Sequence, residues 1–208
     1  MTSKSAIKKQ LILNSAIKVF ADKGYQYATI DDIAKDAGIA KGSVHAYFEN
    51  KLDLLLSSIL LFWQIINDAN AQKIKSNENP VVALKAIFTT FQDILLHDKQ
   101  SLYWGKILQE GLPKIHMIKS KILQQKKTDI DRERKKLIQT IDDVITWGQQ
   151  QGLIKSSINP HVLRQILGGS SQLLVYGLFM QFSQGEGIGY EQQNVRDAMD
   201  LLIDAFAV

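Results

Sequence analysis

The feature that most constrains the fold is the segment of residues 29–48, TIDDIAKDAGIAKGSVHAYF, which has the pattern of two short helices joined at a glycine. The Thr29 hydroxyl can cap the first helix, and Asp32 can reach back to the cap from three residues later. Gly38 can take the positive φ of a sharp turn because it has no Cβ. The pattern predicts a helix-turn-helix whose second helix covers residues 41–47.

The two sides of this second helix are expected to have different roles. Val44 and Phe48 would anchor its inner side in the core. The residues that would point outward are Lys41, Gly42, Ser43, His45 and Tyr47. In helix-turn-helix proteins this side lies in the major groove, against base edges and backbone. The sequence therefore predicts a recognition helix for double-stranded DNA.

The formal charge is concentrated in the same part of the chain. The whole chain carries +4 at pH 7, and up to Lys51 eight lysines stand against five acids, which gives +3 of that total. A local cationic excess favours binding to a polyanion, because binding releases condensed counterions. The remaining three quarters are nearly neutral, so the attraction for DNA is expected at the N-terminal end.

The helix-turn-helix and its flanks contain a characteristic set of residues: Phe20, Gly24, Tyr25, Thr29, Ile33, Ala34, Ala37, Gly38, Gly42, Tyr47, Phe48, Lys51 and Leu54. Together with the preceding run KKQLILNSAIKVFADKGY, they resemble the TetR family of bacterial repressors over the first quarter of the chain. This combination is far more specific than helix-turn-helix spacing alone. One departure is His45 followed by Ala46, where family members usually carry an aromatic residue, so no operator sequence is implied.

The resemblance implies roles for individual residues. Thr29, Tyr47 and Lys51 are expected to contact phosphates, which fix the position of the protein on the duplex. The residues expected to read base identity are Lys41, Ser43, Val44 and His45, with Gly42 beside them. Lysine can donate to guanine acceptors, and valine can meet a thymine methyl group. His45 is equally consistent with a solvated surface position.

The chain shows helical periodicity from end to end, with apolar residues three and four apart and three prolines to interrupt them. We predict an all-α fold of about nine helices. Helices are expected at about 5–23, 51–75, 80–97, 101–110 and 190–206. Gly111 and Pro113 are expected to interrupt the chain after the fourth of these helices. A length of 208 residues accommodates a DNA-binding domain at 1–50 and a larger ligand-binding and dimerisation domain at 51–208.

In TetR-like proteins the larger domain holds a ligand cavity whose occupation releases DNA. Apolar and aromatic candidates for such a cavity here are Trp63, Phe88, Phe91, Tyr103, Trp104, Ile107, Leu108 and Trp147. For any one of them, core packing is the simpler explanation, because a helical bundle needs apolar residues at this spacing with or without a ligand. Residues 145–179 are similar to acyl-CoA-responsive fatty-acid regulators of the family, which makes a small hydrophobic compound or an acyl-CoA the expected effector. The basic run 126–136 could attract its phosphates, or could be a solvated helix face.

The resemblance also implies that the last two long helices form a four-helix interface in a homodimer. The residues expected at this interface are Leu167, Gly168, Ser171, Leu174 and Leu178, since small residues allow helices to approach closely. Packing within one chain is the alternative. A dimer also suits a palindromic operator, because one short recognition helix spans too little DNA.

Several classes of protein are disfavoured by what the sequence lacks. The chain has no cysteine and its four histidines are scattered, so neither a disulfide, a metal site nor a cofactor is predicted. It contains no phosphate-binding glycine loop and no nucleophile elbow, which argues against an enzyme. No basic leader precedes an apolar run, and polar residues interrupt the apolar stretches before bilayer length, so we expect a cytoplasmic protein with no membrane partner.

These observations predict a ligand-responsive transcriptional regulator, most simply a homodimeric repressor. The alternative is an architectural or cell-division factor that uses the same DNA-binding head without controlling transcription.

Overall fold

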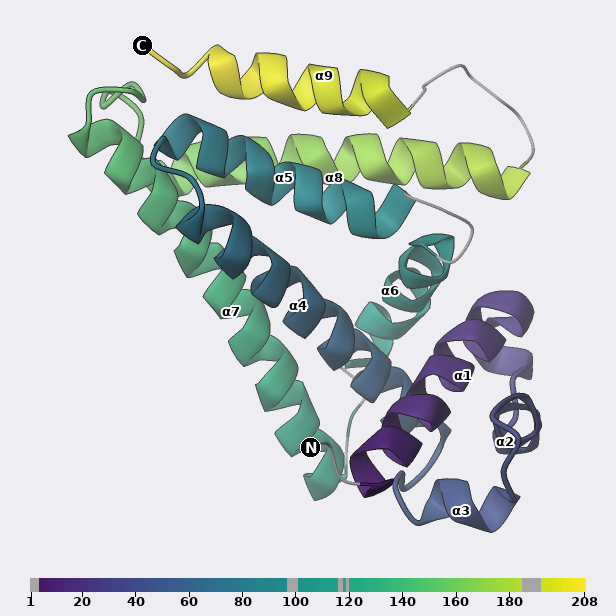
Figure 1. The fold of residues 1–208 in the computed structure, drawn as a ribbon. Coiled ribbons are helices and arrows are strands. Elements are labelled where there is room, and N and C mark those ends of the chain that lie inside the picture. The colour runs from purple at the N-terminus through teal and green to yellow at the C-terminus, as the bar shows by residue number, and fades with distance from the viewer. Residues whose placement is uncertain (1–3, 97–100, 116–117, 119, 185–191) are drawn as a thin grey trace. The chain divides into compact units, whose positions relative to one another are not determined.

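A computed structural model describes residues 4–96, 101–115, 118, 120–184 and 192–208 of the chain (Figure 1). These residues form nine helices: α1 (Lys4–Tyr27), α2 (Ile30–Asp36), α3 (Lys41–His45), α4 (Lys51–Lys75), α5 (Pro80–Leu96), α6 (Ser101–Ile115), α7 (Lys121–Gln150), α8 (Pro160–Gln184) and α9 (Gln192–Asp204). One isolated antiparallel bridge joins Ile154 to Ala207. The all-α prediction is confirmed.

Most helix boundaries follow from short-range signals. Gly24 adopts φ 75° and ψ 153° and breaks the regular helix near the end of α1. The Asn50 side chain accepts a hydrogen bond from the Asp53 N–H at 3.0 Å and so caps α4. Asn79 caps α5 by accepting from the Val81 N–H at 2.8 Å. Each of these positions was predicted, because the cap or break depends on residues within four positions of it.

The predicted end of α6 at Glu110 is wrong. The helix continues through Gly111 and Pro113 to Ile115. Gly111 is buried, and a Cβ built there would lie 2.4 Å from the Ile59 Cδ1 atom of α4. The glycine therefore permits close packing between two helices, and tertiary packing outweighs its low helix propensity.

The contacts divide the chain into two units. Unit 1 comprises Met1–Gln64 and Asp98–Glu133. Its core is formed by fully buried side chains of α1, α2, α4, α6 and α7 and of the residues around α3, including Ile12, Phe20, Ile33, Val44, Phe48, Leu55, Ile107 and Ile130. α1 packs against α2 and α6, and the Lys106 Nζ of α6 donates to the Ala21 carbonyl at 2.8 Å.

Unit 2 comprises Ile65–His97 and Arg134–Val208. α5, α8 and α9 contact one another within it. Its core contains Ala83, Leu84, Ile87, Phe88, Ile141, Ile145, Leu163, Leu167, Met199 and Ile203. Arg196 of α9 pairs with Asp93 of α5, and Lys85 pairs with Asp204 at 2.6 Å. The domain boundary predicted at residue 50 separates the helix-turn-helix from the rest of the chain, a different division from these units, and it stays a prediction.

Among the described residues, α4 is long and apolar enough to cross a bilayer by length and composition. The expectation that polar residues interrupt every apolar stretch is therefore wrong for this helix. However, 56% of its most apolar window is buried inside the protein. A helix in the core of a protein needs the same apolar composition as one in lipid, so the composition of α4 is explained by its burial.

Candidate nucleic-acid interface

The helix-turn-helix begins with the predicted cap. The Thr29 hydroxyl accepts from the Asp32 N–H at 3.1 Å and donates to the Asp32 carboxylate at 2.8 Å. The same carboxylate accepts from the Thr29 N–H at 3.1 Å. This reciprocal arrangement is a capping box and starts α2. Both donors of Thr29 are thus directed at Asp32, and a phosphate at this position would compete with that carboxylate.

The turn and α3 also follow the predicted pattern. Gly38 has φ 64°, in the left-handed region that favours glycine. After the turn, the Ile39 N–H donates to the Ala34 carbonyl at 3.0 Å. α3 ends at His45, two residues earlier than predicted, and the Val44 carbonyl accepts from the N–H groups of both Tyr47 and Phe48 at 3.0 Å.

Burial separates Val44 from the other residues predicted to contact bases. Lys41, Gly42 and His45 are exposed, and Ser43 is half-buried. A Cβ built on Gly42 would meet nothing within 4 Å, so its backbone lies open to a partner. Val44 is 0% exposed and belongs to the core, so the prediction that it meets a thymine methyl group is wrong. Val44 faces the core together with Phe48, and one side chain cannot also face DNA.

Lys51 has a structural role that sequence reasoning missed. Its Nζ donates to the carbonyls of Tyr25 at 2.7 Å, Ala28 at 2.9 Å and Gln26 at 3.2 Å. It also lies 4.6 Å from the centroid of the Tyr25 ring. The break at Gly24 leaves carbonyls at the end of α1 without helical partners, and a lysine can satisfy several of them. That break is the signal from which this role could have been found.

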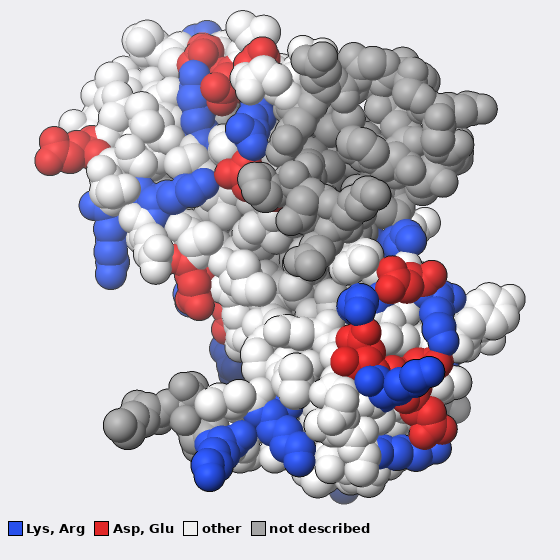
Figure 2. Space-filling model, turned by 45° about the vertical axis from the view of Figure 1, so that its right-hand side comes forward, with Lys and Arg blue, Asp and Glu red and all other residues white. Residues whose placement is uncertain are grey.

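Aspartates of α2 neutralise several lysines of the helix-turn-helix. Lys18 pairs with Asp36 at 2.5 Å, Lys23 with Asp32 at 2.6 Å, and Lys41 with Asp31 at 2.8 Å. Figure 2 shows lysines and carboxylates interleaved over α1 and α2, at the lower right. The excess charge counted along the sequence is therefore not a continuous basic surface.

These pairs shift the protonation equilibria of their members. The pKa of Asp32 is lowered from 3.8 to about 2, first by the hydrogen bond from Lys23 and then by those from Thr29. The bond from Lys18 lowers the pKa of Asp36, and Asp36 in turn raises the pKa of Lys18. Burial raises the pKa of Tyr25. Lys18, Asp32 and Asp36 are consequently ionised at neutral pH.

Replacing Lys23 with glutamine is expected to raise the pKa of Asp32 from about 2 toward 3.8, because the largest cause of the shift is removed. Since the folded-state pKa lies below the unfolded one, ionised Asp32 stabilises the fold above about pH 4, and this contribution is lost as the pH falls toward 2. Carboxyl-carbon NMR titration measures the shift, with Lys35→Gln as the control. An unchanged Asp32 titration in Lys23→Gln would contradict the assignment.

The eight predicted pocket residues do not form one cluster. Trp63, Tyr103, Trp104, Ile107 and Leu108 lie in or against the core of unit 1. The Phe62 ring contacts two of them, with its centroid 5.1 Å from that of Trp63 and 5.5 Å from that of Trp104. Phe88 and Trp147 belong to the core of unit 2, and Phe91 is half-buried in the same unit.

The predicted dimer contacts are partly on the wrong side of α8. Leu167 is 0% exposed and Ser171 is 3% exposed, so both are buried within their own chain. Gly168 and Leu174 are half-buried, and the side chain of Leu178 lies outside the described residues. The exposed apolar residues of α8 are instead Val162, Ile166, Leu173 and Tyr176. Both sides of α8 are apolar, so periodicity alone could not select the outer one.

Comparison with known proteins identifies the family. Residues 12–57 match the model of bacterial regulatory proteins of the tetR family. The fatty acid metabolism regulator protein of Bacillus subtilis is 27% identical over 164 residues, which cover 78% of this chain and 79% of that protein.

No group of three metal-binding side chains is found among the described residues.

Two solved structures share the fold. The fatty acid degradation regulator FadR from Bacillus halodurans has a TM-score of 0.75 at 20% identity and covers 98% of this chain and 96% of its own. FadR from Bacillus subtilis, solved in complex with stearoyl-CoA, has a TM-score of 0.72 at 23% identity and covers 93% and 96%. Each of these relatives is itself a regulator. Residues 12–57 therefore belong to the tetR family of bacterial regulatory proteins, and the chain as a whole is similar to a regulator over more than three quarters of its length.

Proposed function

We propose that this protein is a homodimeric repressor that occupies a palindromic operator and leaves it when a small hydrophobic effector binds. The observation that carries the DNA-binding part is the outer face of α3, where Lys41, Gly42 and His45 are exposed while Val44 and Phe48 fix the helix in the core. Because its inner side is anchored in the core, this short helix can enter a major groove without a change in the fold of the helix-turn-helix.

Within this proposal Lys41, Ser43 and His45 read bases, while Thr29, Tyr47 and Lys51 contact the backbone. Lys41 would exchange Asp31 for an acceptor on the DNA. This exchange is inexpensive, because an ion pair between two exposed side chains contributes only about 0 to 1 kcal/mol. Val44 is left out of the base-reading set because it is buried.

An acyl-CoA is the first effector to test. The similar regulator of Bacillus subtilis was solved with stearoyl-CoA. In unit 1 the Nε1 atom of Trp63 is buried and has no hydrogen-bond partner among the described residues. Buried indole N–H groups usually donate to an acceptor, and a carbonyl of a bound molecule would supply one. The aromatic cluster around Phe62 would then line the apolar part of the site.

Dimerisation is proposed through the outer faces of α8 and α9. Val162, Ile166, Leu173 and Tyr176 follow one another at helical spacing, so they form one stripe along α8. On α9, Leu201 is 71% exposed. Apolar side chains exposed along a whole helix are typical of a surface that a second copy covers.

The expected result is that stearoyl-CoA releases the protein from a duplex selected out of a randomised pool, whereas stearate and free CoA do not. Fluorescence anisotropy with a labelled duplex measures the release. Failure to prefer any duplex would overturn the proposed operator binding. Retention on the selected duplex with all three compounds would overturn only the effector class. Occupancy of many dispersed genomic sites, indifferent to ligands, would favour an architectural factor.

A further inference from the structure

The positive charge of this protein lies in unit 1 and extends beyond the helix-turn-helix. Unit 1 contains sixteen lysines and arginines against eleven acids, whereas unit 2 contains nine against ten. Between Lys106 and Lys127 there are six lysines and one acid, Glu110. This second basic segment belongs to the same unit as α3, although it is more than sixty residues away in the sequence.

Several lysines of the helix-turn-helix are already engaged by aspartates or by carbonyls, as described above. In the second basic segment, Lys106 donates to a carbonyl of α1 and Lys126 pairs with Asp53. Lys121 is exposed and Lys127 is half-buried, and neither has a hydrogen-bond or ion-pair partner among the described residues. These two ammonium groups are therefore available to an external anion.

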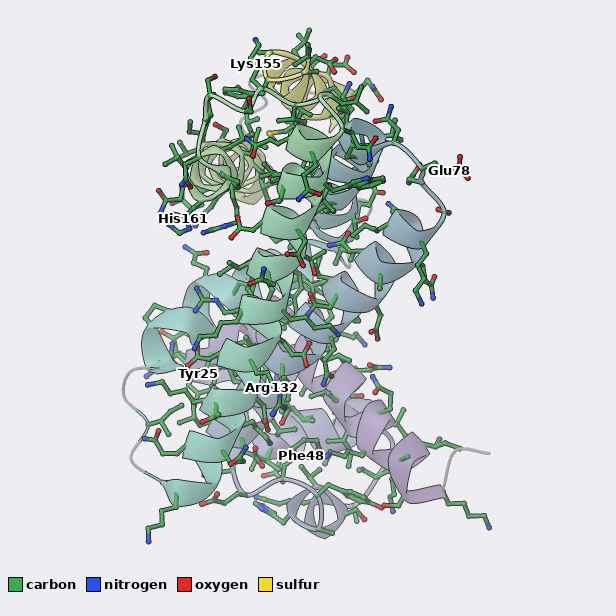
Figure 3. The ribbon with its side chains drawn as sticks, turned by 90° about the vertical axis from the view of Figure 1, so that its left-hand side faces the viewer. Tyr25, Phe48, Glu78, Arg132, Lys155 and His161 are labelled. Atoms are coloured by element: carbon green, nitrogen blue, oxygen red, sulfur yellow. The ribbon has the colours of Figure 1, made fainter. Side chains whose placement is uncertain are left out.

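Contacts within unit 1 place the start of α7 beside the start of α4 and the residues that follow α3. Lys126 pairs with Asp53 in the first turn of α4 and donates to the Ser57 hydroxyl at 2.6 Å. Its Nζ lies 5.7 Å from the centroid of the Phe48 ring, three residues after the end of α3. The Nζ of Lys9 in α1 lies 5.9 Å from the same ring. Figures 1 and 3 show the first residues of α7, α3 and the first residues of α1 at one end of the unit.

The position of this part of α7 is fixed by a largely buried ion pair. The Asp53 side chain is 6% exposed and also accepts from the Glu49 N–H at 2.9 Å. Lys121 and Lys127 are six residues apart, which is about 9 Å along a helix. Residues six apart also differ by about 120° around the helix axis, so the two ammonium groups project in different directions and would contact different phosphates. The N-terminal end of α7 adds the positive end of its dipole.

We propose that Lys121 and Lys127 of α7 form a second DNA-backbone contact, which binds phosphates beside the base pairs that α3 reads. The chemistry is charge-assisted hydrogen bonding to phosphate oxygens, which strengthens binding without selecting a sequence. The proposal rests on the proposed binding of a homodimer to an operator and is independent of the effector.

The test compares the full-length protein with the double variant Lys121→Gln and Lys127→Gln on a selected duplex, over a series of salt concentrations. Each phosphate contact contributes about 0.9 to the slope of log K against log salt concentration. Loss of four lysines from two bound chains is therefore expected to reduce the slope by roughly 3.6. Thermal melting checks that the double variant is folded. If it is unfolded, the single variant Lys121→Gln, at an exposed position, replaces it in the salt series.

The matched control is Lys135→Gln with Lys136→Gln, which removes the same charge from two exposed positions further along α7. The control is expected to keep the wild-type slope. An unchanged slope in the Lys121 and Lys127 variant would overturn the proposal, as would an equal loss in the control. Unchanged DNA binding with a lost response to stearoyl-CoA would also overturn it, because the lysines would then serve an anionic ligand. Failure of the wild-type protein to bind any duplex would instead refute the proposed operator binding.

Discussion

Replacing Leu173 with aspartate is expected to leave the chain folded and to prevent it from dimerising. Leu173 is 73% exposed, so the monomer loses little buried apolar surface. In a dimer formed through the outer faces of α8 and α9, the new carboxylate would have to be buried without a partner, at a cost of several kcal/mol. A two-fold interface contains the substitution twice, which doubles the effect.

Sedimentation equilibrium is expected to give the mass of a monomer for Leu173→Asp and of a dimer for the wild type. Affinity for a palindromic duplex should fall by roughly a hundredfold or more, because two linked reading heads bind far more tightly than one. Gln172→Asp is the control, since Gln172 is the exposed neighbour of Leu173 and lies outside the apolar stripe. A dimeric Leu173→Asp protein would show that the interface lies elsewhere.

Features that depend on neighbours in the sequence were predicted correctly. The capping box of Thr29 and Asp32, the turn at Gly38 and the cap at Asn50 each involve residues no more than four positions apart. The backbone needs a donor, an acceptor or a positive φ at these points, and few residue types supply it. Local chemistry therefore located the helix-turn-helix and most helix ends.

Features that depend on distant residues were not predictable in this way. Gly111 reads as a helix end but serves the approach of Ile59 from another helix. Leu167 reads as an interface residue but is buried in the core of its own unit. Charge counting places a cationic excess in the helix-turn-helix. It cannot show that Lys18, Lys23 and Lys41 each form an ion pair with an aspartate of α2. These outcomes follow from how helices pack, and a one-dimensional pattern does not contain that information.

Replacing Lys51 with methionine distinguishes its two assigned roles. The structure predicts a loss of stability of about 2 to 4 kcal/mol, because three carbonyls lose a charged donor and two of them are partly buried. For a chain of this size the melting temperature should fall by roughly 5 to 15 °C. Methionine retains much of the apolar stem, so the loss reports on the ammonium group.

A phosphate contact alone predicts a different result for the same variant. The melting temperature would then stay at the wild-type value, and only the salt dependence of DNA binding would become shallower. Lys35→Met is the control, since Lys35 is an exposed lysine of α2 whose ammonium group has no partner among the described residues. A loss of stability confined to Lys51→Met would show that the ammonium group closes the end of α1, and that any phosphate must compete with the carbonyls of Tyr25 and Ala28 for it.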